Sequence, residues 1–420
     1  MNKIRLAIVG CGGMGHRHLY GLAELHRAGW ERFELVGVCD PVRVNAESLA
    51  AQAAERFGIR PTIASNLDEL ATVGVEAVDV TTTPRYHHTV TVETLGRGWH
   101  TMVEKPMGLT VRACKLIREA AEASDAILSV AENYRRDPIN RLAKAVLDAG
   151  IVGSPRFLIH QTTGGGDEML ISVWRHQKDQ SGILLDVGVH YTDMMEYLIG
   201  EIDTVYAATR LHEHFRRNPA ADGAEGGADP GGVYGRWQKK MPAEFEATAE
   251  DAAYATLIFE NDVVGQYIED HATHGQDFWS RQIYGSYGVM TLPRDRSGGI
   301  ITLHLAGQAP IDDENILALV PDFQLDAVTT DLFGADRLWR YELPFPETDA
   351  KIIAIEYGEF AQAISEGGAI EVGPDQGMRS VAVCYAILES GKLEHIVTVN
   401  EVLAEHLSRY QQEINESLGI

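Results

Sequence analysis

The stretch Ile4-Arg-Leu-Ala-Ile-Val-Gly10-Cys-Gly12-Gly-Met-Gly15 decides the fold of the first part of the chain. It is an apolar run of strand length that ends in the pattern Gly-x-Gly-x-x-Gly and opens into a helical pattern. Gly10 would make a tight turn, Gly12 would let a pyrophosphate approach the backbone, and Gly15 would let helix and strand pack closely. The free N–H groups of the helix N-terminus would then face the anion. The stretch therefore predicts the first unit of a dinucleotide-binding domain.

A second apolar run, Phe33 to Cys39, ends in Asp40, where an acid is expected to bind the ribose hydroxyls of such a cofactor. The glycine pattern alone is a weak signal, and the alternative is an ordinary glycine-rich turn, which this context disfavours. The Asp40 carboxylate would repel a 2′-phosphate, so we predict NAD rather than NADP. Arg43 is the residue that could reverse this preference, because a guanidinium suits a phosphate.

Length and composition limit the class of protein. With 420 residues, the chain is long enough for two domains. Its 61 acidic and 36 basic residues give a net charge of −25, which disfavours nucleic acid or an anionic membrane as a partner but does not exclude an anionic substrate. The four cysteines are far apart, which is typical of buried thiols in a reducing compartment. The sequence shows no signal peptide and no apolar run of membrane-spanning length, so we expect a soluble, cytoplasmic protein.

Strands and helices alternate over the first third of the chain, which predicts βαβ units and a parallel sheet. Ligands bind beyond the carboxyl ends of the strands of such a sheet. Two of these ends carry reactive side chains: Thr81-Thr-Thr-Pro84 with His87 and His88, and Glu104-Lys105-Pro106. The predicted strands are Phe33 to Cys39, Ala77 to Thr81, His100 to Glu104 and Ala126 to Val130, and the predicted helices are Asn45 to Phe57, His88 to Arg97 and Val111 to Ala123.

The second half predicts an α+β domain with a large open, mostly antiparallel sheet, because β-rich stretches follow one another with short turns between them. Helices frame this sheet, among them one predicted from Ile183 to Ile199. We place the domains at residues 1–133, a Rossmann domain; 134–398, a substrate and oligomerisation domain with an insertion near 210–250; and 399–420, a C-terminal helix.

Two segments lie outside this plan. Asn218 to Gly235 holds six glycines and two prolines, which favours a solvated loop over an active-site lid or a dimer arm. After Asn400, apolar residues at helical spacing predict one helix with Asn400 as its cap and Gly419 as its stop. That helix would pack on its own domain or on another subunit.

The ammonium of Lys105 could stabilise an alkoxide in the cleft, although an isolated Glu-Lys-Pro is more often a surface turn. Asp186, His190 and Asp193 share one face of the helix predicted downstream. Titratable groups on an otherwise apolar helix are costly to bury unless they pair or function, and a histidine beside a carboxylate is a natural general base. A metal site is the competing interpretation, disfavoured because no further ligand has recognisable spacing. The histidines at 212, 214, 271 and 274 are more typical of ordinary polar positions, although residues 271–278 could line a sugar pocket.

The combination of Gly-Cys-Gly-Gly-Met-Gly, Asp40-Pro41, the Thr81 to His88 run, Glu104-Lys-Pro106 and Leu184-Leu-Asp-x-Gly-x-His-x-x-Asp193 resembles the Gfo/Idh/MocA oxidoreductase family. The resemblance implies a Rossmann domain, an open-sheet α/β domain, NAD(P) in the cleft, and a sugar or cyclitol substrate. By motif position, Lys105 would be the catalytic lysine, Asp186 a substrate-binding acid and His190 the proton acceptor. Tyr134 and Arg135 would line the substrate site. The chain departs from the family in having Ile183 where a third small residue is common, and in the insertion and the C-terminal helix.

We therefore expect an NAD-dependent enzyme that oxidises a secondary hydroxyl on a sugar, sugar derivative or cyclitol. The alternatives are a redox-neutral, NAD-dependent glycosidase that acts through transient sugar oxidation and elimination, and a non-catalytic NAD-binding regulatory protein. The resemblance also implies a homodimer or homotetramer built through the open sheet. The residues expected to bind the cofactor are Gly10, Gly12, Gly13, Met14, Gly15, Asp40, Arg43, Thr82, Thr83, Pro84, His88, Glu104 and Lys105.

Overall fold

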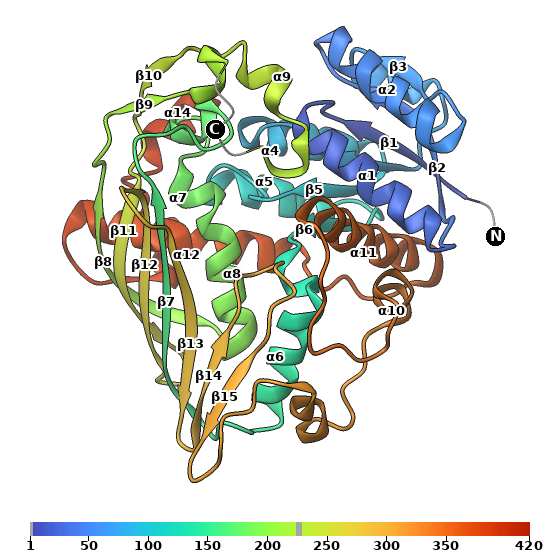
Figure 1. The fold of residues 1–420 in the computed structure, drawn as a ribbon. Helices are drawn as coiled ribbons and strands as arrows, with labels where there is room; N and C mark the ends of the chain where they lie inside the picture. The colour runs from blue at the N-terminus through green and yellow to red at the C-terminus, as the bar shows by residue number, and fades with distance from the viewer. Residues whose placement is uncertain (1–2, 224–228) are drawn as a thin grey trace.

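A computed structural model describes residues 3–223 and 229–420, and Figure 1 shows its two sheets with helices around them. The first sheet is parallel, with strand order β3-β2-β1-β4-β5-β6. This is the order of a dinucleotide-binding Rossmann domain, so the expected fold of the first domain is confirmed. Its strands are β1 (Ile4–Val9), β2 (Phe33–Cys39), β3 (Thr62–Ala64), β4 (Ala77–Val80), β5 (His100–Glu104) and β6 (Leu128–Ala131).

Two glycines of the first turn are explained by the protein's own packing. Gly10 has φ +101°, a conformation that favours glycine, and a Cβ there would lie 2.6 Å from the backbone of Thr81. A Cβ on Gly15 would lie 2.3 Å from the carbonyl oxygen of Gly10, so helix α1 can approach the turn only without a side chain at this position. The helices of this domain are α1 (Gly13–Arg27), α2 (Arg43–Phe57), α3 (Leu67–Ala71), α4 (Pro84–Gly96) and α5 (Val111–Glu122).

Helix α4 begins four residues earlier than the sequence predicts. Pro84 is its first residue, where the missing N–H is tolerated, and Thr83 is the N-cap. The Thr81-Thr-Thr-Pro motif is therefore the turn from β4 into a helix N-terminus, and it lies at the carboxyl edge of the sheet beside the first glycine turn.

The second sheet has strand order β15-β14-β13-β7-β12-β11-β8-β16. Its strand pairs are antiparallel except for β7 and β12, which are parallel, so the prediction of a largely antiparallel sheet is confirmed. Strand β13 was missed by the sequence prediction. The strands are β7 (Pro155–Gly165), β8 (Ile202–Arg210), β11 (Ala252–Phe259), β12 (Val264–Thr273), β13 (Phe278–Gly285), β14 (Gly288–Leu292), β15 (Thr302–Leu305) and β16 (Val397–Thr398); β9 (Phe215–Arg217) and β10 (Glu244–Glu246) form a separate ribbon.

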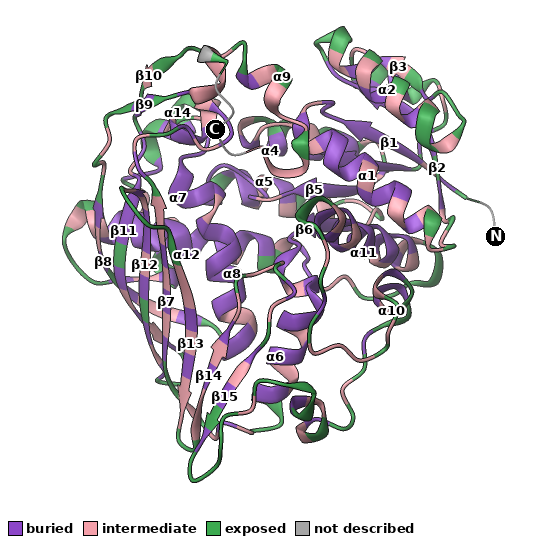
Figure 2. Cartoon of the chain, viewed as in Figure 1, coloured by how far each residue is buried: buried purple, intermediate pink, exposed green. Residues whose placement is uncertain are grey.

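Helices cover one face of the second sheet, and the main apolar core lies between them and the strands (Figure 2). The helix predicted from Ile183 to Ile199 is two helices, because the chain turns at Val187. The helices that follow the first domain are α6 (Pro138–Asp148), α7 (Ile183–Asp186), α8 (Gly188–Ile199), α9 (Gly235–Gln238), α10 (Ala327–Phe333), α11 (Phe345–Glu366) and α12 (Pro374–Leu393), and the short 3₁₀ helices are 134–136, 173–176, 219–222, 230–232 and 314–319.

Helix α11 belongs to the second half of the sequence but packs on the first domain (Figure 1). Its Ile353 meets Gly21 of α1, where a Cβ would lie 2.4 Å from the isoleucine side chain. The Tyr357 hydroxyl donates to the buried carboxylate of Asp79 on β4. The apolar surface of α1 and β2 is thus covered by a segment more than 300 residues away along the chain.

The single C-terminal helix predicted after Asn400 is wrong. The structure has α13 (Val399–Leu403) and α14 (Gln412–Leu418), separated by a turn in which Glu405 has φ +57°. Thr398, rather than Asn400, caps α13, since its hydroxyl accepts from the Glu401 N–H. Gly419 ends α14 as predicted, and this segment packs on its own chain, where the Asn415 side chain bonds the Thr110 hydroxyl.

Candidate active site

A cavity of about 630 Å³ runs along the carboxyl edge of the first sheet. The glycine turn and the Thr81-Thr-Thr turn form one wall, and residues of the second domain form the other. This is the place and size that a dinucleotide requires. The lining residues include Gly10, Gly12, Gly13, Met14, Asp40, Thr82, Thr83, Trp174, Tyr234, Trp237 and Met241.

Gly12 supplies a direct test of whether this cavity fits a diphosphate. A Cβ built on Gly12 meets no heavy atom within 4 Å, so no packing within the described protein requires glycine there. The side chain would instead point into open space at the start of α1, where N–H groups favour an anion. The residues present therefore fit the cofactor that the glycine pattern predicts.

Asp40 lies at the end of β2, as predicted, and is oriented by three donors. Its carboxylate accepts from the backbone N–H groups of Cys11 (2.9 Å) and Val42 (2.8 Å) and from the Asn45 amide. Arg43 lies outside the lining of this cavity, and its exposed guanidinium pairs with Glu47 at 2.9 Å. The acid that would bind a ribose is in place, whereas the arginine that could bind a 2′-phosphate points elsewhere.

A smaller cavity of about 240 Å³ continues from the first and shares Met14, Thr82 and Trp174 with it. Lys105, Asp186, His190 and Tyr134 all line it, so the structure brings these four predicted site residues together. Further lining residues are Arg17, Pro84, His87, Glu104, Asn133, Leu170, Ile171, Arg175, Val187, Pro230 and Arg296.

Lys105 is held in this cavity by Asp186. Its Nζ donates to the carbonyl oxygen of Asp186 at 2.9 Å and to the carboxylate at 3.3 Å. The other carboxylate oxygen lies 3.1 Å from Nε of Arg175. Although burial alone would raise the pKa of Asp186, the charges of Arg175 and Lys105 hold it below its usual value. A buried carboxylate thus positions two cations beside the cavity.

His190 is bound through Nδ1 to Glu132, with both carboxylate oxygens at 2.8 Å. Burial, followed by the charges of Lys105 and Arg296, lowers the pKa of His190 well below its usual value. Burial raises the pKa of Glu132 to about 7. Among residues 3–223 and 229–420, no hydrogen-bond partner faces Nε2, which leaves this nitrogen available as a proton acceptor when Nδ1 donates to Glu132.

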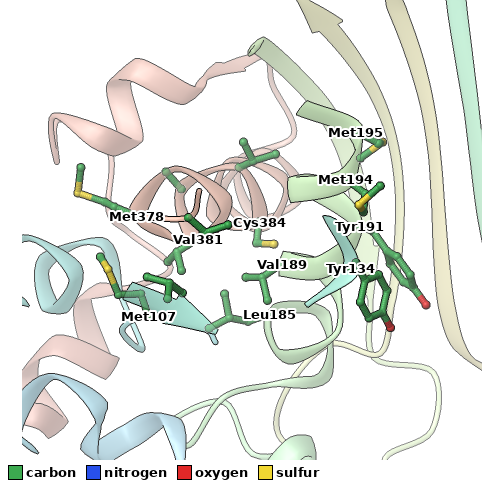
Figure 3. Packing of buried hydrophobic residues seen from close by; sticks show 14 of the residues in the cluster. Met107, Tyr134, Leu185, Val189, Tyr191, Met194, Met195, Met378, Val381 and Cys384 are labelled. Carbon is green, nitrogen blue, oxygen red and sulfur yellow. The ribbon is translucent and has the colours of Figure 1, made fainter. Parts of the chain in front are cut away.

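Tyr134 stacks on the His190 ring, with ring centroids 4.0 Å apart and an angle of 4° between the planes. Its hydroxyl accepts from Arg296 at 3.3 Å. Figure 3 shows Tyr134 beside Tyr191 on the sheet side of α8, while Leu185 and Val189 point the other way, toward Val381 and Cys384 of α12. The apolar residues of α7 and α8 therefore fix the helices to α12 and leave Asp186 and His190 facing the cavity.

Besides Arg43, three further predicted residues lie apart from the two cavities just described. The Arg135 guanidinium donates two hydrogen bonds of 2.6 Å to the Asp193 carboxylate, so these two predicted residues pair with each other. His88 bonds the neighbouring Thr89 hydroxyl, and His87 lines the smaller cavity in its place. Gly15 is enclosed by the turn. These three residues support the site without reaching it.

Sequence reasoning missed several residues that line the smaller cavity, called the catalytic cavity below, or that bind its side chains, as Glu132 binds His190. Glu132 directly follows β6 at the carboxyl edge of the sheet, and this position could have marked it. Arg175 lies in the 3₁₀ helix 173–176 and Arg296 in a turn after β14, both outside the motifs of the sequence, and no sequence signal identifies them. His271 lines a third cavity, of about 690 Å³, together with Trp279 and Asp277, so this segment does border a cavity, and the sugar-pocket alternative stays a prediction.

Histidine, cysteine and carboxylate side chains of the described residues form no group of three or more that could hold a metal ion. The three residues proposed as metal ligands are instead paired with protein side chains: Asp186 with Lys105 and Arg175, His190 with Glu132, and Asp193 with Arg135.

The helices in the described part of the chain include none with the length and apolar character of a membrane span.

Comparison with known families places this chain. Residues 4–132 match an oxidoreductase family described by its NAD-binding Rossmann fold, and residues 144–399 match the C-terminal alpha/beta domain of the same family. The chain belongs to the Gfo/Idh/MocA oxidoreductase family. It is an oxidoreductase with an NAD-binding Rossmann domain, and NAD is its cofactor.

Individual relatives agree with this assignment. Levoglucosan dehydrogenase of Pseudarthrobacter phenanthrenivorans is 28% identical over 421 residues, 96% of this chain and 100% of the relative. The NAD-dependent scyllo-inositol 2-dehydrogenase of Bacillus subtilis is 28% identical over 211 residues, 50% of this chain and 58% of the relative. A solved levoglucosan dehydrogenase complex with NADH has a TM-score of 0.73 at 22% identity, covering 95% of this chain and 99% of that one. At that identity, the solved structure supports the fold alone.

Proposed function

We propose that this enzyme oxidises a secondary hydroxyl on a sugar, sugar derivative or cyclitol, with NAD as the hydride acceptor. The relatives support the substrate class, because their names are those of levoglucosan, inositol and D-apiose dehydrogenases. The polar lining of the catalytic cavity, with its cations and carboxylates, also suits a ring that carries several hydroxyls.

One observation carries the proposal: Lys105 and His190 line the same cavity. This catalytic cavity continues into the larger cavity along the glycine turn, called the cofactor cavity here. In the proposed reaction, Nε2 of His190 accepts the hydroxyl proton while Glu132 holds Nδ1 and stabilises the resulting imidazolium. Lys105 donates to the substrate oxygen and stabilises its developing negative charge. Held by the glycine turn and Asp40, NAD would supply the acceptor for the hydride that leaves the carbon bearing this oxygen.

Asp186 has two roles in this scheme. Its carboxylate fixes the Lys105 ammonium, and it is available to accept from a neighbouring ring hydroxyl. Arg175 shares the same carboxylate, so the acid remains ionised when it is enclosed. An isolated buried carboxylate would instead favour its protonated form.

The decisive experiment measures absorbance of reduced nicotinamide with NAD and a panel of sugars, cyclitols and glycosides. We expect absorbance to grow with turnover for at least one ring alcohol, and no signal for primary alcohols that lack a ring. If the enzyme bound NAD but reduced none of it with any compound, and formed no product, the regulatory alternative would replace this proposal.

A second candidate function is the redox-neutral glycosidase, and one cavity favours it. The 690 Å³ cavity shares Tyr134, Leu170, Val187 and Arg296 with the catalytic cavity. It has room for a second ring beside the one that reacts. The same panel separates the two functions, since a glycosidase of this kind would release the leaving group from a glycoside without net accumulation of reduced cofactor.

A further inference from the structure

The part of the insertion from Asp229 to Met241 lies against the Rossmann domain. The solvated loop expected over Asn218 to Gly235 is therefore wrong for residues 229–235, and its residues 224–228 lie outside the described part of the chain. Its side chains line both cavities: Tyr234, Trp237 and Met241 the cofactor cavity, and Pro230 the catalytic one. The segment therefore extends along the cleft from one cavity to the other. Figure 1 shows α9 next to α4, near the start of α1.

Tyr234 is fitted to the glycine turn. The two carboxylate oxygens of Asp229 accept from the N–H groups of Tyr234 (2.7 Å) and Gly235 (3.2 Å), which fixes the backbone. The Tyr234 hydroxyl lies 2.9 Å from Sδ of Met14. A Cβ on Gly13 would lie only 2.1 Å from a Tyr234 ring carbon. Gly13 is not one of the three glycines of the dinucleotide pattern, and the contact with Tyr234 explains why a glycine fits there.

Two further residues hold the segment to α1 and α2. The Arg236 guanidinium donates to Nε2 of His16 at 2.8 Å and to the Ser48 hydroxyl, and it stacks on Trp237 with 3.8 Å to the ring centroid. The Trp237 indole N–H donates to the Asn45 side chain at 3.3 Å. His16 is suited to accept this bond, because burial and then the Arg236 charge lower its pKa to about 4 and keep it neutral.

We infer that residues 229–241 form a strap over bound NAD, that Tyr234 and Trp237 are cofactor-binding residues, and that the cofactor leaves only when the strap detaches. The strap joins the second domain to α1 and α2 across the cleft, so its contacts resist both entry and exit. This inference concerns the cofactor, so it holds whichever ring alcohol is the substrate.

The rate of NADH dissociation tests the strap. NADH is bound to the intact enzyme and displaced with excess NAD while its fluorescence is followed. Replacing Tyr234 and Trp237 together by alanine should raise the dissociation rate about tenfold or more, the scale of losing one or two buried aromatic contacts. Lys240→Ala is the matched control, because it changes the same segment at an exposed lysine. An unchanged rate in the double variant would overturn the inference.

Gly13→Ala provides a second and sharper test. The new methyl group should displace Tyr234 and raise the dissociation rate in the wild-type background, but add little in the Tyr234→Ala background, where the space is free. Equal effects in both backgrounds would show that the methyl group acts on the cofactor directly and not through the strap. Should the aromatic variants fail to fold, hydrogen exchange of residues 229–241 in the wild-type enzyme decides instead: NAD should slow their exchange, and no change would refute the strap.

Discussion

Both carboxylate oxygens of Glu132 lie 2.8 Å from Nδ1 of His190, on the ring whose Nε2 is free to accept a proton. The pair resembles the carboxylate and histidine of other general bases, in which the acid fixes the ring and its tautomer. Burial acts on the two groups in opposite directions, since it raises the pKa of Glu132 to about 7 and lowers that of His190.

The first prediction concerns the pH profile. The His190–Glu132 pair can accept the substrate proton only while the pair is deprotonated. Because burial raises the pKa of Glu132 to about 7, kcat/KM should fall as the pH drops below about 7. Glu132→Gln should move this acid limb to lower pH, because the remaining histidine has a lowered pKa. An acid limb that stays in place in the variant would mean that another group titrates.

Replacing His190 by Asn should lower turnover by roughly 10²-fold or more and flatten the acid limb, as removal of a general base does. His304→Asn is the control, since that histidine is exposed on β15 and lines none of the three cavities described above. Turnover close to that of the wild-type enzyme would place the proton path elsewhere.

Replacing Lys105 by Ala should cost about 3 kcal/mol of transition-state stabilisation, the scale of losing one preorganised donor. The dissociation constant of NAD should change little, because the ammonium is bound to Asp186 and faces the substrate side. Kinetics and NAD titration are measured together, with Lys144→Ala as the control, because this partly exposed lysine pairs with Asp148 outside both cavities. A loss confined to KM would argue for a binding role alone.

Cofactor preference follows from Asp40 and Arg43. We expect NAD to bind more tightly than NADP, and Asp40→Ala to reduce the difference. Arg43→Ala should leave it unchanged, since this guanidinium pairs with Glu47 and lies outside the cavity. Tighter binding of NADP by the wild-type enzyme would contradict the prediction.

The uncovered face of the second sheet predicts assembly. Tyr206 and Tyr254 are 54% and 37% exposed there, on the neighbouring strands β8 and β11, and Phe157 of β7 is 38% exposed two strands further along the sheet from β11. Aromatic residues gathered on one sheet face are typical of an interface between subunits. Light scattering at micromolar concentration should give a multiple of 46.1 kDa, and Tyr206→Glu should weaken the assembly. A monomeric mass for the wild-type chain would refute it.

Much of this fold could be predicted because its signals are local. The glycine turn, Asp40 and the Glu104-Lys105-Pro106 end of β5 each follow a strand whose apolar pattern is unmistakable, and βαβ topology then places all three at one edge. The stripe from Asp186 to Asp193 was predicted on one helical face, and the structure gives each of its members a partner of its own.

What could not be predicted depends on contacts between distant segments. Arg175 reaches the cavity from the short 3₁₀ helix 173–176 and Arg296 from a turn, and nothing in their local sequence specifies that contact. The insertion gave a wrong expectation for the same reason. Its glycines and prolines indicate a flexible loop, whereas Tyr234 and Trp237 find their packing partners on helices some 200 residues earlier in the chain.

The position of α11 has a consequence for how the protein is made. The nucleotide-binding domain emerges from the ribosome first, but the helix that covers α1 and bonds Asp79 is translated more than 200 residues after β6. Until then, Phe33 and its neighbours lack the cover of Tyr357 and Phe360. Synthesis must therefore be nearly complete before the first domain can bury its core. A chain truncated before residue 345 would expose this apolar surface to chaperones and would not give a stable nucleotide-binding domain.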